Sequence, residues 1–228
     1  MITIAEKLKN PVWHSLNETH NKFLVPFEGV QFYDPKISNF GAFFDTTKTA
    51  EALTAYAELT EDFFLISENS VPLIDDKTIL LEKKIEGCQM VLENLTDIKI
   101  TENIVLLTAQ SIDEIYDLIW LVMPGFYRKQ GFKMGHYFGI YKDDKLVAIT
   151  GQRMQTDDFI EISGVVTHPS YTRRGFAQQL IAHTTKEILK KNKLPILHTN
   201  KGNTAIPLYE KLGYKITRDM NWWHYRKK

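Results

Sequence analysis

The segment VVTHPSYTRRGFAQQL, residues 165–180, constrains the fold more than any other part of the chain. Its first residues are β-branched and apolar, which favours a strand that ends at Thr167 before Pro169. After Gly175, apolar residues recur at helical spacing through residue 191, which predicts a long amphipathic helix. A strand, a short basic turn and a helix that starts at a glycine therefore follow one another directly.

This arrangement can hold a pyrophosphate. The first turn of a helix exposes amide N–H groups without partners and carries the positive end of the helix dipole. Gly175 lets the backbone approach a ligand because it has no Cβ, and Ala177 keeps the helix close to the sheet. Arg173 and Arg174 add positive charge beside the same turn. A ligand-free arginine pair on the surface is the alternative interpretation.

Apolar periodicity and turn residues predict the remaining elements. In the first hundred residues they predict a helix over 50–59 capped by Thr46 or Thr47, a strand over 63–67, and strands over 78–84 and 88–94 joined by a turn at Gly87. Later in the chain they predict strands over 104–109, 136–141, 145–154, 159–169, 194–199, 214–218 and 221–226, and helices over 112–123, 175–191 and 204–212. Strands before, between and after helices indicate an α+β fold with a mixed, partly parallel sheet.

Three of these elements carry explicit boundary signals. Ser111 followed by Glu114 has the capping-box spacing at the start of the helix over 112–123. Asp143 and Asp144 supply the turn of a hairpin. Thr204 is the expected cap of the helix over 204–212, because Pro207 is then inside the first turn, where no N–H is needed.

Charge is divided unevenly, although the whole chain has no net charge. Residues 1–100 carry 9 basic and 16 acidic side chains, a balance of −7, so the remainder carries +7. A basic half on a neutral chain suits a small polyanion better than a nucleic acid or an anionic membrane. The polar stretch 96–103 predicts a boundary, with an N-terminal α/β domain over 1–98 and a second domain over 99–228.

Cysteine content and apolar runs indicate in which compartment the protein works and which metal sites it can form. Cys88 is the only cysteine, so neither an internal disulfide nor a thiolate zinc cluster is expected. Six of the seven histidines show no metal-ligand spacing: His14, His20, His136, His168, His183 and His224. No apolar run has the character of a signal peptide or of a membrane span. The expectation is a cytoplasmic protein without a metal, either a monomer or a homodimer.

Two motifs resemble those of the GNAT superfamily of N-acetyltransferases. TRRGFA, residues 172–177, resembles the family's Q/R-x-x-G-x-G/A signature, with Thr172 where the family has Gln or Arg. GNTAIPLYEKLGYK, residues 202–215, resembles the block N-x-x-A-x-x-L-Y-x-x-x-G-F/Y, but Asn203 lies one residue too close to Ala205. The resemblance covers residues 102–228. It is greatest to the glycine N-acyltransferase-like branch, in which a smaller, degenerate α/β half precedes the catalytic one.

The resemblance implies a GNAT fold that binds acetyl-CoA as co-substrate. The strand before the turn would bind the pantetheine arm through its backbone, and the turn and first helical residues would bind the pyrophosphate. Asn203 would face the cofactor, with Asn200 as a second candidate. The cofactor-binding residues so implied are Val165, Val166, Thr167, Thr172, Arg173, Arg174, Gly175, Phe176, Ala177, Gln178 and Asn203.

Acyl transfer from a thioester to an amine needs proton transfer but no covalent enzyme nucleophile. By resemblance, Tyr209 lies near the sulfur and would be the acid that assists the leaving thiolate; a tyrosine that only packs beneath the sheet is the alternative. Glu161 and His198 compete for the role of base. Strand alternation places Glu161 on one face with Ser163, Val165 and Thr167, and an ion pair with Arg153 is its alternative role. His198 is either a base or a hydrogen-bonded core histidine.

These features predict an N-acyltransferase that moves an acetyl or other short acyl group from acyl-CoA to a small-molecule or peptide amine. A catalytically silent acyl-CoA-binding sensor or scaffold is the alternative. Trp222, Trp223, Phe126 and Tyr127 are candidates for an acceptor pocket, or else core. The N-terminal half is expected to pack on the catalytic half and to border that pocket, because no flexible linker separates the two.

Overall fold

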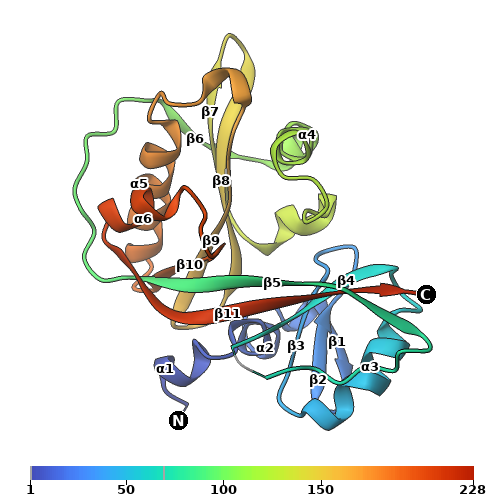
Figure 1. The fold of residues 1–228 in the computed structure, drawn as a ribbon. Helices are drawn as coiled ribbons and strands as arrows, with labels where there is room; N and C mark the ends of the chain where they lie inside the picture. Colours follow the sequence, from blue (N-terminus) through green and yellow to red (C-terminus); the bar gives the residue numbers. More distant parts are fainter. Residues whose placement is uncertain (1, 69) are drawn as a thin grey trace.

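The computed structural model describes residues 2–68 and 70–228. Within them, eleven strands form one mixed sheet in the order β1-β2-β3-β4-β11-β5-β10-β9-β8-β7-β6 (Figure 1). Helices cover both faces of the sheet around β7 to β10, with α5 and α6 on one side and α4 on the other (Figure 1). The α+β class with a mixed sheet, expected from the sequence, is confirmed.

The strands differ greatly in length. Most have four to nine residues, whereas β5 and β11 have 14 each and cross the molecule from one end to the other (Figure 1). The strands are β1 (Leu24–Phe27), β2 (Val30–Tyr33), β3 (Phe40–Phe43), β4 (Asp62–Ser67), β5 (Ile79–Leu92), β6 (Ile104–Leu107), β7 (Tyr137–Lys142), β8 (Lys145–Gln155), β9 (Phe159–Thr167), β10 (Leu194–Asn200) and β11 (Tyr214–Lys227).

The longest helix is α5, with 14 residues. The α-helices are α1 (Ile4–Lys7), α2 (Pro11–Asn17), α3 (Thr49–Tyr56), α4 (Ile112–Val122), α5 (Phe176–Leu189) and α6 (Ile206–Lys211). The 3₁₀ turns are η1 (Asn21–Phe23), η2 (Thr46–Lys48), η3 (Ala109–Ser111), η4 (Lys129–Met134) and η5 (Pro169–Tyr171). Among the described residues, no helix is both long enough and apolar enough to cross a bilayer.

The predicted turn at Gly87 is wrong. Residues 79–92 form the single strand β5, and β11 is likewise continuous where two closing strands were expected. Gly87 is required for packing, because a Cβ built there would lie 1.7 Å from Cζ3 of Trp222 and 2.8 Å from the carbonyl oxygen of Thr199. A glycine in a strand therefore indicates close approach of a neighbour here, not a turn.

Two predicted helix caps are also wrong, for one physical reason. A 3₁₀ turn precedes both α3 and α4, so the unpaired amides that need a cap lie about one turn earlier. Asp45 and Thr108 accept hydrogen bonds from the amides of Thr47 and Gln110 in these turns, whereas the side chain of Ser111 makes no capping bond. The hairpin turn is confirmed, since Asp143 and Asp144 have φ angles of 49° and 59°, as a two-residue turn with both residues left-handed requires.

The sheet joins the first and last parts of the chain. β5, from the N-terminal part, lies between β10 and β11, and β11 also pairs with β4. The division at residue 98 falls in the irregular segment that connects β5 to β6. It stays a prediction.

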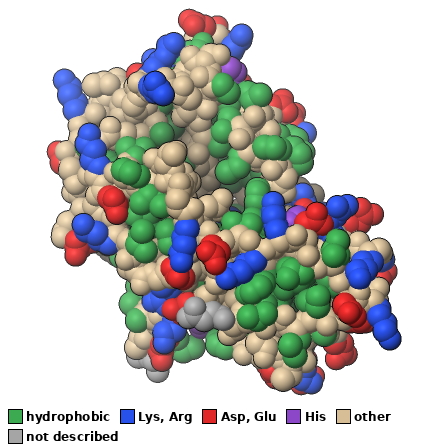
Figure 2. Space-filling model, in the orientation of Figure 1, with side chains coloured by type: hydrophobic (Ala, Val, Ile, Leu, Met, Phe, Trp, Pro, Cys, Tyr) green, Lys and Arg blue, Asp and Glu red, His purple; other side chains and the backbone are tan. Residues whose placement is uncertain are grey.

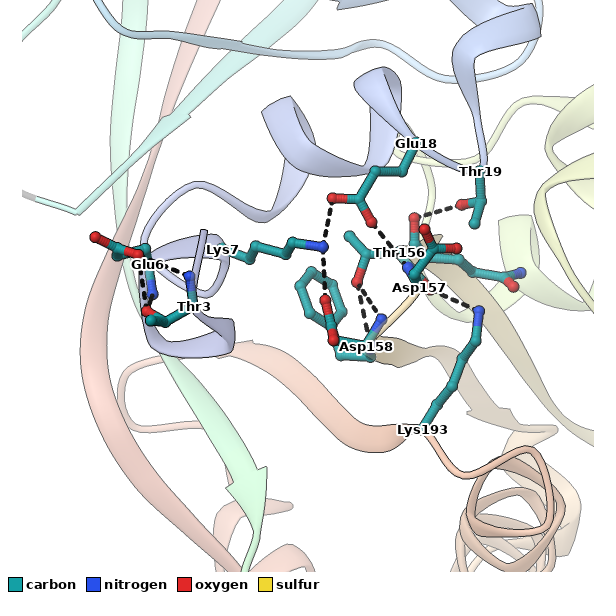
Figure 3. A network of polar contacts seen from close by, with 11 residues as sticks. Thr3, Glu6, Lys7, Glu18, Thr19, Thr156, Asp157, Asp158 and Lys193 are labelled. Carbon is teal, nitrogen blue, oxygen red and sulfur yellow. Dashed lines mark hydrogen bonds and ion pairs between the residues drawn. The ribbon is translucent and has the colours of Figure 1, made fainter. Parts of the chain in front are cut away.

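Polar contacts fasten the N-terminal helices to the β8–β9 connection (Figure 3). Lys7 Nζ pairs with Glu18 at 2.8 Å and with Asp158 at 2.6 Å, and Glu18 accepts a hydrogen bond from the amide of Asp157. Lys193, which precedes β10, donates to the carbonyl oxygen of Thr156 in the same connection. The N-terminal segment is thereby held against the start of β9, at the opposite end of this strand from the site described below.

We expect Gly87→Ala to lower the free energy of unfolding by about 1–3 kcal/mol, the usual cost of overfilling a packed position. Urea denaturation against the exposed neighbour Glu86→Ala measures the difference. Combining Gly87→Ala with Trp222→Leu should recover part of the loss, since the clash is with that ring. A Gly87→Ala protein as stable as the wild type would contradict this account of β5.

Candidate active site

The site begins where two parallel strands separate. β9 and β10 pair from Phe159 opposite Leu194 to Ile162 opposite Leu197, and no further. Beyond that point β10 continues on its other edge with β5, as far as Asn200 opposite Gly87. The backbone of β9 after Ile162 therefore faces a gap instead of a neighbouring strand, which leaves polar backbone groups available to a ligand.

Gly164 adds a bulge to β9 at this gap. Its φ of +61° is in the left-handed region, and the pairing with β8 jumps from Gly151 opposite Ser163 to Ile149 opposite Val166. The bulge exchanges the two faces of the strand. Val165 packs on the α5/α6 side with Ile162, and Glu161 lies on the opposite face. The predicted common face for Glu161 and Val165 is therefore wrong.

A cavity of about 210 Å³ occupies the gap. Its wall combines the end of β9, the end of β10 and the start of α6 with residues from the N-terminal part of the chain. Hydrophobic side chains border a hollow between the α5/α6 side and the α4 side of the face in Figure 2. The lining residues are Phe40, Ile85, Met123, Phe126, Arg153, Ile162, Ser163, Gly164, Val165, Leu197, His198, Thr199, Asn200, Asn203, Tyr209 and Trp222.

The basic turn leads into α5 as the sequence predicts. Gly175 is the residue before the helix, with a φ of +78°, and a Cβ there would meet only Nε2 of Gln179 at 3.9 Å. The first main-chain bond of the helix runs from Gln179 N to Gly175 O, so the amides of Phe176, Ala177 and Gln178 have no partner within the helix. Space and free donors for a phosphate are both present.

The side chains around this turn have different environments. Thr172, Arg173 and Arg174 are exposed; Arg174 lies over the ring of Tyr171 and donates to the carbonyl oxygen of Ser170. Phe176 is 4% exposed and packs in the core between α5 and the sheet, so only its backbone is available to a ligand. Arg173 has a φ of +61°, a conformation unusual for a residue with a side chain.

The strand residues implied for the pantetheine arm are only partly at the cavity. Val165 lines it. Val166 is 3% exposed and packs against α4, and Thr167 pairs with Ala148 of β8. On the edge away from β8, the backbone of Val166 and Thr167 has no neighbouring strand among the described residues, and this edge leads from the gap toward the turn before α5.

The start of α6 differs from the prediction. Ala205 precedes the helix and Pro207 is its second residue, so Thr204 is not the cap. Asn203 lines the cavity, but its side chain is already engaged: Oδ1 accepts from the amide of Ala205 at 2.9 Å, and Nδ2 donates to Oγ1 of Thr199. Asn203 itself supplies the turn contact that was expected of Thr204.

Tyr209 projects from α6 to the cavity and is 7% exposed. Burial raises the pKa of its phenol to about 12, so the hydroxyl stays protonated at neutral pH. In residues 2–68 and 70–228 this hydroxyl has no hydrogen-bond partner. It is therefore a buried donor that is open to a ligand.

Glu161 is a fully buried carboxylate with every acceptor position in use. Arg153 donates to its two oxygens from Nε and Nη2, each at 2.7 Å, and the amide of Met154 and Nδ1 of His198 donate as well. Burial alone raises the pKa of Glu161, but the charge and hydrogen bonds of Arg153, with those of His198, outweigh it and lower the pKa to about 2. The ion pair named as an alternative role for Glu161 is present.

His198 is a link in the same buried chain. Its ring is 1% exposed; Nδ1 lies 2.8 Å from Glu161, and Nε2 lies 3.0 Å from Nε2 of Gln89. Gln89 is fully buried and also donates to the carbonyl oxygen of Leu8. With the amide in this orientation, Nε2 of His198 accepts and Nδ1 donates, so the ring presents no free nitrogen to the cavity.

Several lining residues were not predicted. Phe40 and Ile85 come from parts of the chain without motifs, and no sequence signal marks Gln89. Arg153 was considered only as a partner of Glu161, although a charge far inside the mostly apolar strand KLVAITGQRM is a signal. Of the proposed aromatic wall, Phe126 and Trp222 line the cavity. Trp223 does not: it packs with the β1–β4 core on the other face.

A second, smaller cavity of about 60 Å³ adjoins the first. It shares Phe40, Met123, Phe126, Arg153, Ser163 and Gly164 with the larger one, and adds Ile37, Ser38, Ile119, Tyr127, Arg128, Gly131, Met134 and Tyr137. Residues from before β3 and from η4 close its inner end. The N-terminal part of the chain thus borders both cavities. The described residues include no cluster of three or more His, Cys, Asp or Glu suited to a metal ion.

Comparison with known proteins agrees with this geometry. Residues 137–223 match the family model described as FR47-like protein. No curated protein sequence matches the chain. A GNAT-family protein from Novosphingobium aromaticivorans has a TM-score of 0.86 at 24% identity, covering 97% of this chain and 98% of that one.

Two further solved structures share the fold. A GCN5-related N-acetyltransferase from Kribbella flavida has a TM-score of 0.68 at 15% identity, covering 100% of this chain and 96% of its own. A GCN5-related N-acetyltransferase-like protein from Streptococcus suis has a TM-score of 0.64 at 15% identity, with coverages of 96% and 92%. The chain therefore has the fold of the GNAT acetyltransferases over nearly its whole length.

The lowered pKa of Glu161 predicts an acid-sensitive contribution to stability. Its pKa falls from 4.5 to about 2 on folding, so the contribution is complete above pH 4.5 and is lost as the pH falls toward 2. A shift of this size corresponds to on the order of 3 kcal/mol. Glu161→Gln should lack this dependence and be destabilised at pH 7 by about 3–5 kcal/mol, since Arg153 is then buried without its partner.

Urea unfolding between pH 7 and pH 2.5 measures the effect, with the exposed Glu82→Gln as the matched control. Wild type and control should converge toward Glu161→Gln as the pH falls. Parallel curves for wild type and Glu161→Gln across this range would show that the carboxylate titrates at its ordinary pKa.

Proposed function

We propose that the protein is an N-acyltransferase that moves an acetyl or other short acyl group from acyl-CoA to an amine by direct attack. The observation that carries the proposal is the cavity between the separated ends of β9 and β10. A buried phenol enters it from α6 on one side, and an apolar wall with one arginine edge encloses it on the α4 side. A thioester lying along the gap would meet an amine arriving from the other face.

The donor would run along the free edge of β9 toward the turn before α5. The unpaired amides of Phe176, Ala177 and Gln178 would bind the pyrophosphate, with charge from Arg173 and Arg174. Val165, Val166 and Thr167 would bind the pantetheine arm through main-chain groups, and the side chain of Asn203 borders its inner end. The exposed hydroxyl of Thr172 donates to Pro169 and adds little to this contact.

The bulge at Gly164 supplies a candidate for oxyanion stabilisation. Gly164 and Val165 have no opposite residue on β8 or on β10, and both line the cavity. Main-chain N–H groups fixed at such a point can donate to the oxygen of the tetrahedral intermediate without reorganising. Gly164 suits this position because its left-handed backbone is strained for other residues.

The amine must lose a proton before or during attack. Glu161 and His198, the two candidates for the base, both use their acceptor positions inside the buried network. A carboxylate with a pKa of about 2 is also a weak base. We therefore assign both residues to positioning Arg153, and propose that the proton leaves through water in the open part of the cavity.

Tyr209 would act on the leaving group. Its protonated hydroxyl lies in the cavity beside the gap, where it can donate a hydrogen bond or a proton to the departing thiolate. A module that binds acyl-CoA without reacting needs neither this donor nor a second cavity beyond it. The branch within the superfamily, the cytoplasmic location and the oligomeric state stay predictions.

Gly175→Glu should weaken binding of CoA at least ten-fold, because the side chain fills the space above the turn and places a negative charge there. Isothermal titration calorimetry measures the affinity. Gly125→Glu is the matched control, since Gly125 also has a positive φ and open space but lies beside α4. Unchanged affinity in a folded Gly175→Glu protein would place the pyrophosphate elsewhere.

Tyr209→Phe should lower kcat on the order of 100-fold with little change in the KM for acetyl-CoA, because the phenol acts mainly on the leaving thiolate. Release of free CoA thiol from acetyl-CoA with a panel of amines is the assay, and also tests the proposed function itself. Tyr116→Phe, outside the cavity, controls for loss of a phenol. Equal kinetics for Tyr209→Phe and wild type would return Tyr209 to a packing role.

A further inference from the structure

Arg153 has hydrogen-bonding capacity that the protein does not use. Its Nε and Nη2 donate to Glu161, but no residue in the described ranges accepts from Nη1. The side chain is 19% exposed and lines both cavities, with its guanidinium 4.7 Å from the ring centre of Phe40. The free edge of the guanidinium therefore faces the space where an acceptor would lie.

A second guanidinium lines the smaller cavity. Arg128 Nη2 lies 3.4 Å from the carbonyl oxygen of Asp62 and 3.7 Å from its carboxylate, so this pairing is loose. The same carboxylate is also bound by Nε2 of His224. Two arginines with free donors beside a cavity of about 60 Å³ suit a small, planar anion better than an apolar group.

Part of the remaining wall is apolar. Phe40, Met123 and Phe126 line both cavities, and Ile85 and Trp222 extend this surface in the larger one. Phe126 is fixed by stacking on Phe64 with ring centres 5.3 Å apart. An occupant that fills this space buries apolar surface between its anionic end and the acyl group.

We propose that the acceptor is an α-amino acid with a large apolar side chain, whose carboxylate is bound by Arg153 and Arg128. The inference rests on the proposed function, since the amine must meet the thioester in the larger cavity. The carboxylate lies in the smaller cavity, and the side chain packs on Phe40, Met123 and Phe126. The amine nitrogen forms the amide bond and the bond from the acyl carbon to sulfur breaks. Tyr209 gives its proton to the sulfur, so CoA leaves as the thiol, and the proton lost by the amine passes through water and restores the phenol.

A buried chain of hydrogen bonds holds Arg153 for this role. It runs from the carbonyl oxygen of Leu8 through Gln89 and His198 to Glu161, which fixes two nitrogens of the guanidinium. Each link is buried, so the orientation of the free edge is set before any ligand binds. Gln89, His198 and Glu161 are positioning residues in this proposal, and Arg153 is the one that touches substrate.

The experiment compares L-phenylalanine and L-methionine with L-phenylalaninamide, phenethylamine and glycine as acceptors for acetyl-CoA. Release of CoA thiol gives kcat/KM, corrected for the unprotonated fraction of each amine. The two apolar amino acids should exceed the amide and the simple amine by about 10- to 100-fold, the usual effect of hydrogen bonds between charged groups. Equal use of phenethylamine would overturn the anion site, and equal use of glycine would overturn the apolar side-chain site.

Variants of Arg153 and Arg128 test whether these two side chains bind the carboxylate. Arg153→Lys keeps a charge beside Glu161 but removes the free guanidinium edge, and Arg128→Gln removes the second one. Each should lower kcat/KM for L-phenylalanine about 10- to 100-fold more than it lowers kcat/KM for phenethylamine. Arg226→Gln, at an exposed arginine that lines neither cavity, is the control. An unchanged ratio between the two acceptors in Arg153→Lys would overturn the proposal.

Direct binding separates this proposal from the proposed function. Calorimetry of L-phenylalanine with the CoA-saturated protein needs no chemistry. If no amine is acetylated, but L-phenylalanine binds the wild type and not Arg153→Lys, the anion site holds and the transferase activity is refuted. Acetylation of simple amines, with no binding of L-phenylalanine, refutes the amino-acid site and leaves the transferase intact.

Discussion

The ion pair between Glu161 and Arg153 is the interaction on which the site depends. A carboxylate buried completely in a protein is costly unless its charge and all its acceptor positions are matched, and here two N–H groups of one guanidinium, a main-chain amide and an imidazole do so. The two hydrogen bonds to Glu161 fix the side chain of Arg153 at the border of the two cavities. The same network also leaves Glu161 and His198 without a free acceptor position, although both residue types commonly act as bases.

The second constraint is the separation of β9 from β10. The N-terminal part of the chain compensates for the lost pairing, because its strand β5 bonds to the other edge of β10. β10 loses β9 after Leu197 but keeps β5 along its other edge, so its backbone stays paired through Asn200. β5 in turn is fixed by the long β11 and by the contact of Gln89 with Leu8. The same N-terminal part supplies Phe40 and Ile85 to the cavity wall. The N-terminal part therefore both supports the strands around the cavity and forms part of the cavity wall.

Sequence patterns predicted the structure correctly where residues close together in the chain decide it. The strand, turn and helix around Gly175 and the hairpin at Asp143 follow from residues within a few positions of one another. Gly87 was misjudged because its surroundings come from elsewhere in the chain: the ring of Trp222 lies against it. Thr204 was misjudged for a local reason, since the preceding residue, Asn203, accepts the hydrogen bond from the amide of Ala205 at the start of α6. Trp223 follows Trp222 directly, and strand alternation sends it to the opposite core.

Short-range residue patterns alone predict the basic turn before α5, the order of elements in the second part of the chain and the resemblance to the GNAT acetyltransferases. Only the tertiary structure decided which side chains meet. Gln89, His198, Glu161 and Arg153 come from four different strands, and a bulge at Gly164 resets which face of β9 each residue occupies. Burial and hydrogen bonding across strands depend on register, and register is a property of the assembled sheet.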